Sequence, residues 1–369
     1  MRIGILTLPL STNYGGNLQA YALQTVLKRL GHDVLVISKP SYYELPSFKT
    51  ILNRYIHNFF SSNKVDVYVE KHLNEKIDKS FNTNTYLLEK TGEFINLYIQ
   101  QKKIKFFSEL QCGDFDVFFV GSDQCWRPIY ANPIQGYYLN FAKSWRIKRI
   151  AYAVSFGVDK WEYSENDTLK CKKLVKKFDA VSVREDSAIG ICKSYLDIDA
   201  KHVLDPTMLL SKEDYIVLID AFKTKCVSQP INDLFCYILD VTDQKRTIIS
   251  SVSNALNSFY TLCEDFYVEE WLNAFYTAKI VLVDSFHGAV FSIIFNKPFW
   301  VIGNAKRGNA RFSSLLKMFG LEDRLIDPED YVSVDWKAGI DWIKVNETLE
   351  KQKKHSMAFI VENLEKNIS

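Results

Sequence analysis

Short apolar runs alternate with amphipathic stretches along most of the chain. The first run, Arg2 to Leu8, precedes apolar residues that recur at helical spacing from Leu18 to Leu30. Gly31 follows directly, where a glycine commonly ends a helix, and Asp33 to Ser38 is the next apolar run. Because a strand, a helix and a second strand follow one another in so short a stretch, the opening predicts a βαβ unit.

The same alternation continues into the middle of the chain and then resumes, which predicts two domains. Leu204-Asp205-Pro206-Thr207 marks the boundary, since proline interrupts regular structure. We therefore expect an α/β protein with two Rossmann-like domains facing a cleft, residues 1–205 and 206–369. Residues Asp335 to Asn367 are expected to form one or two helices that cross back over the first domain. Further predicted strands are Asp116 to Val120, Ile150 to Val154, Ala180 to Val183, Lys201 to Leu204, Leu234 to Leu239, Lys279 to Val283 and Phe299 to Ile302, and further predicted helices are Asp167 to Lys177, Val268 to Ala278 and one from near Phe286.

Residues 41–112 interrupt the first domain. The part from Ser41 to Thr91 contains no glycine and carries many tyrosine and phenylalanine side chains. Such aromatic residues more commonly pack as a small core than bind a ligand, so we expect a helical, aromatic-rich insertion that covers the domain. The alternative use of this insertion is a flap on which an acceptor sugar or lipid rests.

Composition restricts the class of protein. Of the 369 residues, 47% are hydrophobic and 24% are charged, which is ordinary for a globular chain. The 46 basic and 44 acidic residues nearly balance, so we expect no nucleic-acid partner, and any anion site must be built from local residues. The seven cysteines include no C-x-x-C pair, which argues against a zinc site and a disulfide framework and favours a reducing, cytoplasmic location.

The apolar runs also bear on membrane and metal binding. Met1 to Thr7 has the pattern of a strand rather than a signal peptide, and no apolar run approaches the roughly 18 residues of a membrane span. We expect at most peripheral contact, at the inner face of a membrane. His287 has no neighbouring histidine or cysteine, and the acidic residues do not group at ligand spacing, so we expect no metal and no cofactor.

The segment from Val283 to Ala289 is the strongest candidate for a functional site. An apolar strand stops there, and a helix begins with a histidine in its first turn. Asp284 or Ser285 can cap this helix, whose free N–H groups and positive dipole end attract an anion. His287 adds a group that can donate or accept a proton near neutral pH.

Polar residues follow other predicted strands too, and ligands of parallel α/β sheets bind at the carboxyl ends of strands. Arg184 follows one strand, and Lys306 and Arg307 follow another, so cations from both domains would face one cleft. The loop after the first strand lacks the spacing of a phosphate-binding glycine motif, and we expect it to line the cleft as a tight turn. Further candidates for substrate contact are Asn13, Gly15, Gly16, Asn17, Ser122, Ser285, Gly288 and Trp126, although an indole more commonly packs in a core.

Five motifs occur together in one order. Because of these motifs, residues 1 to about 325 of the chain resemble the polysaccharide pyruvyl transferase family. The resemblance implies a two-domain fold similar to GT-B glycosyltransferases, with phosphoenolpyruvate as donor. It implies as acceptor a hydroxyl pair of a saccharide or lipid-linked oligosaccharide, and as product a pyruvate ketal in exopolysaccharide or capsule biosynthesis. The motifs are Thr12-Asn13-Tyr14-Gly15-Gly16-Asn17-Leu18-Gln19-Ala20-Tyr21-Ala22-Leu23-Gln24, Gly121-Ser122-Asp123-Gln124, Ser182-Val183-Arg184-Glu185, Leu204-Asp205-Pro206-Thr207 and Asp284-Ser285-Phe286-His287-Gly288.

The resemblance also implies roles for residues, with one departure from the family pattern. Many members have an arginine two residues before the histidine, where this chain has Ser285. Either another cation, Arg307 or Arg311, takes its place, or the donor differs. The family's donor-binding arginine, its histidine at the helix start and its lysine after the following strand correspond to Arg184, His287 and Lys306.

The chemistry of phosphoenolpyruvate requires cationic side chains and a group that exchanges protons. Phosphoenolpyruvate carries a carboxylate and a phosphate, so it needs two cationic or N–H-lined subsites. Arg184 offers a bidentate fork for one, and Lys306 with the helix N-terminus offers charge and donors for the other. His287 would act as acid or base, and a carboxylate, Asp123 or Asp284, would hold the imidazole or accept the sugar proton.

Two other functions are compatible with the sequence. One is a nucleotide-sugar glycosyltransferase on the same two-domain frame, and the other is a non-catalytic relative that binds carbohydrate. Substitution of His287 separates the second from both enzymes, because a binding protein would keep its affinity for sugar whereas an enzyme would lose turnover.

Overall fold

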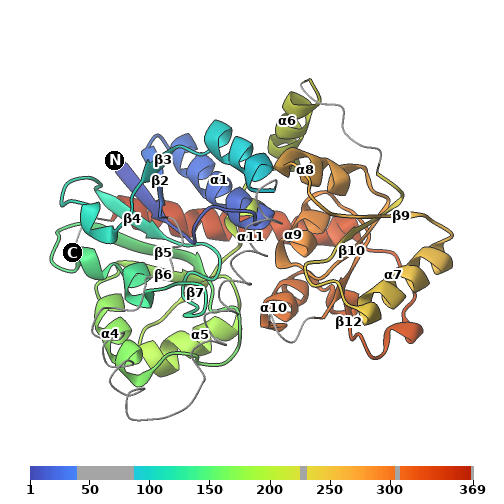
Figure 1. Cartoon of the computed structure of the whole chain (residues 1–369). Helices are drawn as coiled ribbons and strands as arrows, with labels where there is room; N and C mark the ends of the chain where they lie inside the picture. Colours follow the sequence, from blue (N-terminus) through green and yellow to red (C-terminus); the bar gives the residue numbers. More distant parts are fainter. Residues whose placement is uncertain (40–86, 225–230, 304–307, 367–369) are drawn as a thin grey trace, which may run out of the picture.

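The computed structural model describes residues 1–39, 87–224, 231–303 and 308–366. These residues form two α/β lobes side by side, drawn from blue to green and from yellow to orange in Figure 1. Each lobe contains one sheet, and all described pairings in both sheets are parallel. The prediction of two Rossmann-like domains is confirmed.

The first sheet has seven strands in the order β3-β2-β1-β4-β5-β6-β7. Its central strands are buried on both faces, which is why Val117–Val120 and the part of the next strand from Ile150 to Val154 are continuous apolar runs rather than alternating ones. The winding of the chain reverses between β1 and β4, and ligands of such sheets collect at this point. The strands are β1 (Arg2–Leu6), β2 (Asp33–Ser38), β3 (Gln101–Lys103), β4 (Val117–Val120), β5 (Lys148–Val154), β6 (Ala180–Val183) and β7 (Lys201–His202).

The first helix, α1 (Tyr14–Arg29), begins where Asn13 caps it. Asn13 Oδ1 accepts a hydrogen bond from Gly16 N at 3.0 Å, which satisfies one of the N–H groups that a helix start leaves free. One face of α1 packs on the sheet and the opposite face partly meets solvent, as its helical spacing of apolar residues predicts. The other helices of this domain are residues 87–98, α4 (Glu165–Val175) and α5 (Ser187–Ile191).

The insertion expected at 41–112 is not helical throughout. Residues 40–86 lie outside the described residues, and residues 87–98 form a helix. β3 then pairs with β2 as the edge of the first sheet, and Gln24 holds it there by two hydrogen bonds to the main chain of Gln100, at 2.8 and 3.0 Å. The expectation of a helical insertion is wrong for Gln101–Lys103, because a strand of three residues is too short for its sequence pattern to be recognised.

The second sheet has five strands in the order β12-β11-β10-β8-β9, with the reversal of winding between β8 and β10. Helix α9 is buried along its whole length, which explains why its sequence is apolar on every side. The strands are β8 (Leu234–Tyr237), β9 (Tyr260–Leu262), β10 (Ile280–Val283), β11 (Phe299–Ile302) and β12 (Leu325–Ile326), and the helices are α6 (Lys212–Lys223), α7 (Asp243–Leu256), α8 (Val268–Thr277), α9 (Phe286–Ile294) and α10 (Ala310–Phe319).

The last helix, α11 (Trp342–Glu365), runs from the second lobe back to the first, and Figure 1 shows it in red behind both. Ser356 Oγ accepts a hydrogen bond from Leu204 N at 2.9 Å, and Lys148 Nζ donates to Leu364 O at 2.7 Å. These bonds tie the end of the chain to the first domain. Of the helices in the described residues, none has both the length and the apolar character needed to span a bilayer.

Candidate functional site

Side chains from both domains meet where the carboxyl edges of the two sheets face each other. Arg184 follows β6, Asp123 lies in the loop after β4, Asp205 follows β7, and His287 lies in the first turn of α9. Parallel strands end along one edge, so residues far apart in sequence become neighbours there. We call these four residues the interdomain cluster. All four are buried, with exposed fractions of 2% to 5%.

The loop after β4 turns sharply and directs Asp123 into the cluster. Gly121 has a φ of 126°, and a Cβ there would lie 2.0 Å from Tyr152 O, so only glycine fits. Ser122 follows, with its Oγ 3.2 Å from Asp205 Oδ2. Asp123 itself has a φ of 62°, a left-handed conformation that aspartate tolerates better than most residues. The main chain of this turn therefore sets the position of the carboxylate.

Arg184 lies between two carboxylates. Its Nη1 donates to Asp205 Oδ2 at 2.7 Å and its Nη2 to Asp123 Oδ1 at 3.1 Å, and its guanidinium lies over the Phe286 ring, 4.3 Å from the centroid. Burial opposes the charge, but the two carboxylates outweigh it and hold the pKa of Arg184 above its ordinary value. Its Nε is buried and has no hydrogen-bond partner among the described residues.

Asp205 is the centre of the cluster. Its Oδ1 accepts hydrogen bonds from Thr207 N at 3.0 Å and Thr207 Oγ1 at 2.7 Å, while its Oδ2 lies 2.7 Å from Arg184 Nη1 and 3.7 Å from His287 Nε2. Burial raises the pKa of this carboxyl, but the neighbouring His287 and Arg184 lower it more, so its pKa lies below the ordinary value. Asp205 is therefore ionised at neutral pH.

Sequence reasoning did not select Asp205 as a site residue. It used the surrounding motif as a domain boundary and as part of the family resemblance. The available signal was a polar residue directly after the predicted strand Lys201 to Leu204, at the sheet edge where ligands bind.

His287 comes from α9 of the second domain and lies against the first turn of α1. A Cβ added at Gly15 would lie 2.0 Å from His287 Nδ1, so only glycine leaves room for the ring. On the other side, His287 Nε2 is buried and has no hydrogen-bond partner in the described residues, with Asp205 Oδ2 at 3.7 Å. Gly15 thus brings the imidazole next to the N–H groups at the start of α1.

A second arginine lies beside this cluster. Arg311, in the first turn of α10, is buried, and its guanidinium lies 5.8 Å from the centroid of the same Phe286 ring. Burial lowers the pKa of Arg311 to about 10, and the positive charge of Arg184 acts in the same direction. Ser285, where many family members have arginine, is the buried N-cap of α9, and its side chain makes no capping bond. Two guanidinium groups thus lie near the starts of α9 and α10.

The carboxylate beside the imidazole is Asp205, not Asp123 or Asp284, and this corrects the sequence prediction. Asp284 accepts hydrogen bonds from Leu239 N at 2.6 Å and Lys245 Nζ at 2.5 Å, so it holds the loop after β8. Asp123 binds Arg184. Burial raises the pKa of Asp123, but the charges of Arg184, His287 and Arg311 lower it below the ordinary value, which makes it a weak base.

Trp126 and Gly288, predicted to contact substrate, pack in the protein interior instead. The Trp126 indole is fully buried and stacks on Tyr138, with the ring centroids 4.5 Å apart, so no face is left for a sugar. A Cβ at Gly288 would lie 2.7 Å from Val283 Cγ1, and the glycine therefore allows α9 to approach β10 closely. Both residues therefore contribute to the site through packing and not through contact with a ligand.

The predicted loop after β1 shapes the start of α1. Asn17 Nδ2 donates to Ser11 O at 2.7 Å, Asn13 caps the helix, and a Cβ at Gly16 would lie 3.2 Å from the Asn13 side chain. These contacts fix the turn that holds Gly15 against the imidazole. The predicted residues Lys306 and Arg307 lie outside the described residues.

A pocket of about 530 Å³ opens beside the start of α10. Gly308 and Asn309 line one side of it, and Val158, Asp159 and Glu162 from the segment after β5 line another. Glu162 accepts hydrogen bonds from Arg127 at 2.8 and 3.1 Å, so on that side Asp159 offers carboxylate oxygens that can accept hydrogen bonds from a ligand. Within the described ranges, no group of three or more histidine, cysteine, aspartate or glutamate side chains is arranged to hold a metal ion.

Solved structures with the same overall arrangement share little sequence with this chain. UDP-GlcNAc 2-epimerase from Neisseria meningitidis, bound to UDP-GlcNAc, matches over all of both chains with 10% identity and a TM-score of 0.51. UGT89C1 from Arabidopsis thaliana, complexed with UDP-L-rhamnose, matches over 98% of this chain and 97% of its own, with 10% identity and a TM-score of 0.49. The first likeness concerns the fold alone, which is GT-B-like as the sequence resemblance implied.

The sequence itself identifies the family. No curated protein matches the chain. The profile described as polysaccharide pyruvyl transferase matches residues 13–306, from the N-cap of α1 to beyond β11, and this range includes Arg184, Asp205 and His287. Because the match covers most of its length, the chain belongs to the polysaccharide pyruvyl transferase family.

Proposed function

We propose that this protein transfers the pyruvyl group of phosphoenolpyruvate to two hydroxyls of a saccharide, forming a pyruvate ketal and releasing phosphate. Family membership supports a transferase that acts on a polysaccharide. The observation that carries the proposal is the interdomain cluster with Arg311 beside it, where a buried imidazole, an ionised carboxylate and two guanidinium groups lie between the domains. The acceptor is a saccharide or lipid-linked oligosaccharide of exopolysaccharide or capsule biosynthesis, met at the inner face of the membrane.

The proposed reaction needs proton transfer and stabilisation of negative charge. A proton adds to the methylene carbon of phosphoenolpyruvate, and the first sugar hydroxyl attacks C2 and loses its proton. The bond from C2 to the phosphate oxygen then breaks, and the second hydroxyl adds to C2 and loses its proton. One proton ends on carbon and one on the departing phosphate or solvent, so the atoms balance. Phosphoenolpyruvate is a substrate in this scheme, and no cofactor or metal is invoked.

We assign the proton transfers to His287. It is the histidine of the interdomain cluster, and an imidazole can both donate and accept a proton, as general acid–base catalysis requires. Asp205, 3.7 Å from His287 Nε2, orients the imidazole and stabilises its protonated form. Asp123 serves as a positioning residue for Arg184, since its lowered pKa makes it a weak base.

We assign the negative groups of the donor to the arginines and the helix starts. Both Nη groups of Arg184 are bonded to carboxylates, so this residue has its Nε to offer, while Arg311 supplies a second guanidinium. The first N–H groups of α9 and α10 add donors, and Lys306 and Arg307 add charge from the segment before α10. Arg311 thus compensates for the serine at position 285.

Calorimetric titration of the full chain with phosphoenolpyruvate and a panel of nucleotide sugars tests the proposal without knowledge of the acceptor. Arg311→Gln and Lys306→Ala each remove one proposed donor contact. Arg246→Gln, an exposed residue of α7, is the matched control for charge. We expect selective binding of phosphoenolpyruvate, weakened at least about ten-fold in the first two variants and unchanged in the control.

Binding of a nucleotide sugar instead of phosphoenolpyruvate would replace the proposal with a glycosyltransferase function. His287→Gln distinguishes an enzyme from a carbohydrate-binding protein. We expect this variant to retain donor binding and to lose phosphate release from phosphoenolpyruvate when a pool of candidate saccharides is present. Equal phosphate release in this variant and the wild type would contradict the assigned role.

A further inference from the structure

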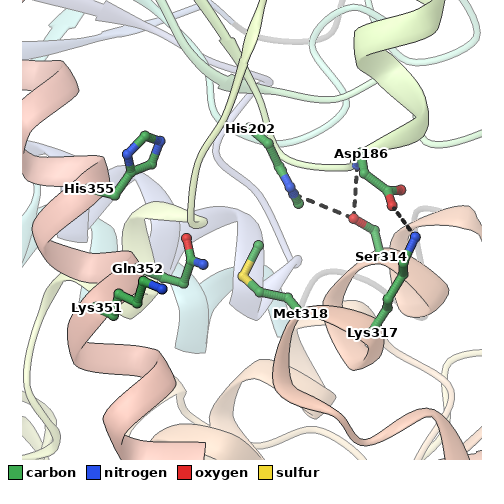
Figure 2. A pocket seen from close by; sticks show the side chains of 8 residues that line it. All are labelled: Asp186, His202, Ser314, Lys317, Met318, Lys351, Gln352 and His355. Carbon is green, nitrogen blue, oxygen red and sulfur yellow. Dashed lines mark hydrogen bonds and ion pairs between the residues drawn. The ribbon is translucent and has the colours of Figure 1, made fainter.

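A second pocket lies at the edge of the domain interface and contains none of the four residues of the interdomain cluster. It has a volume of about 480 Å³, and three parts of the chain line it, as Figure 2 shows. His202 at the end of β7 and Asp186 before α5 come from the first domain. α10 of the second domain contributes Ser314, Lys317 and Met318, and α11 contributes Lys351, Gln352 and His355.

The lining of this pocket carries more positive than negative groups. Lys317 and Lys351 bring ammonium groups from two different helices, and His202 and His355 bring imidazoles. Asp186 is the one carboxylate in the described lining, and it forms an ion pair with Lys317 at 3.5 Å. No carboxylate of the described chain pairs with Lys351, whose charge therefore remains available to a ligand.

Ser314 and His202 are held in place by hydrogen bonds, and one wall of the pocket is apolar. Ser314 is buried, and its Oγ accepts a hydrogen bond from Asp186 N at 2.9 Å and lies 3.4 Å from His202 Nε2. Figure 2 shows the Met318 thioether between the α10 and α11 side chains. A cavity of this size holds a small organic molecule, and its mixed lining suits one with an anionic end and a less polar body.

The pocket is connected to the interdomain cluster through the main chain. His202 Nε2 lies 3.0 Å from Arg184 O, so the same imidazole contacts the Ser314 hydroxyl and the residue that binds both cluster carboxylates. A ligand between α10 and α11 that also contacts His202 would bridge the first domain, the second domain and the helix that crosses them. Such a ligand stabilises the arrangement of the domains in which it binds.

We propose that this pocket is a binding site for a small phosphorylated ligand. The phosphate lies beside the Lys351 ammonium, with hydrogen bonds from His355 and Gln352 of the same helix, and the organic part lies against Met318. The proposal goes beyond pyruvyl transfer and does not rest on it, because none of these side chains takes part in the proposed reaction. Free phosphate and a sugar phosphate share the recognised group, and the experiment separates them.

Calorimetric titration of the full chain with inorganic phosphate and with glucose 1-phosphate tests the proposal. Lys351→Glu reverses the unpaired charge in the pocket, and Lys354→Glu makes the same change at an exposed residue of α11 outside the pocket. We expect the Kd of both anions to rise at least about ten-fold in Lys351→Glu and to stay within about two-fold in Lys354→Glu. Arg311→Gln, which weakens the proposed donor site, should leave this binding unchanged.

Tighter binding of glucose 1-phosphate than of phosphate would support a phosphorylated organic ligand, and equal affinities would support a site for free phosphate. Equal loss of affinity in Lys351→Glu and Lys354→Glu would overturn the proposal, because the effect would then come from net charge. Loss of binding in Arg311→Gln would also overturn it, since the anion would then occupy the proposed donor site between the domains. Absence of saturable binding of either anion to the wild type would do the same.

Discussion

The close contact between Gly15 and His287 leads to a sharp prediction. In Gly15→Ala the new Cβ would lie 2.0 Å from His287 Nδ1 and 2.1 Å from Cγ. An ordinary contact needs at least 3.4 Å, so the ring or the first turn of α1 must move by about 1.4 Å. Because α1 is fixed by Asn13 and by the sheet beneath it, we expect the imidazole to move away from its place beside Asp205.

A displacement of this size has a large expected effect on catalysis and a smaller one on stability. Misplacement of a catalytic group by about 1 Å costs on the order of 100-fold in rate, which corresponds to about 2.7 kcal/mol. Overpacking of a buried contact costs about 1–3 kcal/mol of stability, part of which the better helix propensity of alanine offsets. The variant should therefore fold and be nearly inactive.

Two measurements test this reasoning for Gly15→Ala. Phosphate release from phosphoenolpyruvate with a saccharide acceptor gives the rate, and a crystal structure of the variant gives the position of the ring independently of the proposed function. Gly16→Ala is the matched control, because its Cβ would lie 3.2 Å from Asn13, a side chain that can give by a few tenths of an ångström. An unmoved imidazole, or equal losses of rate in the two variants, would refute the reasoning.

Three further predictions concern stability. Arg184→Met should lower the free energy of unfolding by about 3–5 kcal/mol in urea denaturation, because it leaves two buried carboxylates unpaired, and a loss under about 1 kcal/mol would contradict this. The pKa values of Asp123 and Asp205 are lowered in the folded protein, so the unfolded chain binds more protons in acid. The free energy of unfolding should therefore decrease as the pH drops below about 5, and Asp205→Asn should make this decrease smaller. Gly190→Ala, with open space around the new Cβ, should raise stability by about 0.4–1 kcal/mol, and a lowered Tm would argue against the helical conformation of α5.

The fold class follows from local patterns that the sequence carries by itself. Strands buried on both faces tend to be apolar at successive positions, so β4, β10 and β11 stand out as short apolar runs. The helices between them show apolar residues at helical spacing. Because connections between parallel strands are right-handed, alternating strands and helices leave few possible arrangements, and the Rossmann-like domains are among them.

The same patterns place the site at a sheet edge, since every candidate follows a predicted strand. They do not show which candidates touch. Asp205 and Asp284 both follow predicted strands, and both are buried, yet Asp205 lies beside the imidazole while Asp284 holds Lys245. The choice between them depends on how the two domains meet.

The sequence alone thus determined the two domains, their parallel sheets and the edge that carries the polar residues, because each of these depends on burial that repeats along the chain. Tertiary structure alone decided that His287 fits against Gly15, that Arg184 is shared by two carboxylates, and that α11 returns to line a second pocket. These contacts join residues from different elements and different domains. Their geometry is set by how the domains and the crossing helix pack. The spacing of apolar residues along the chain does not determine that packing.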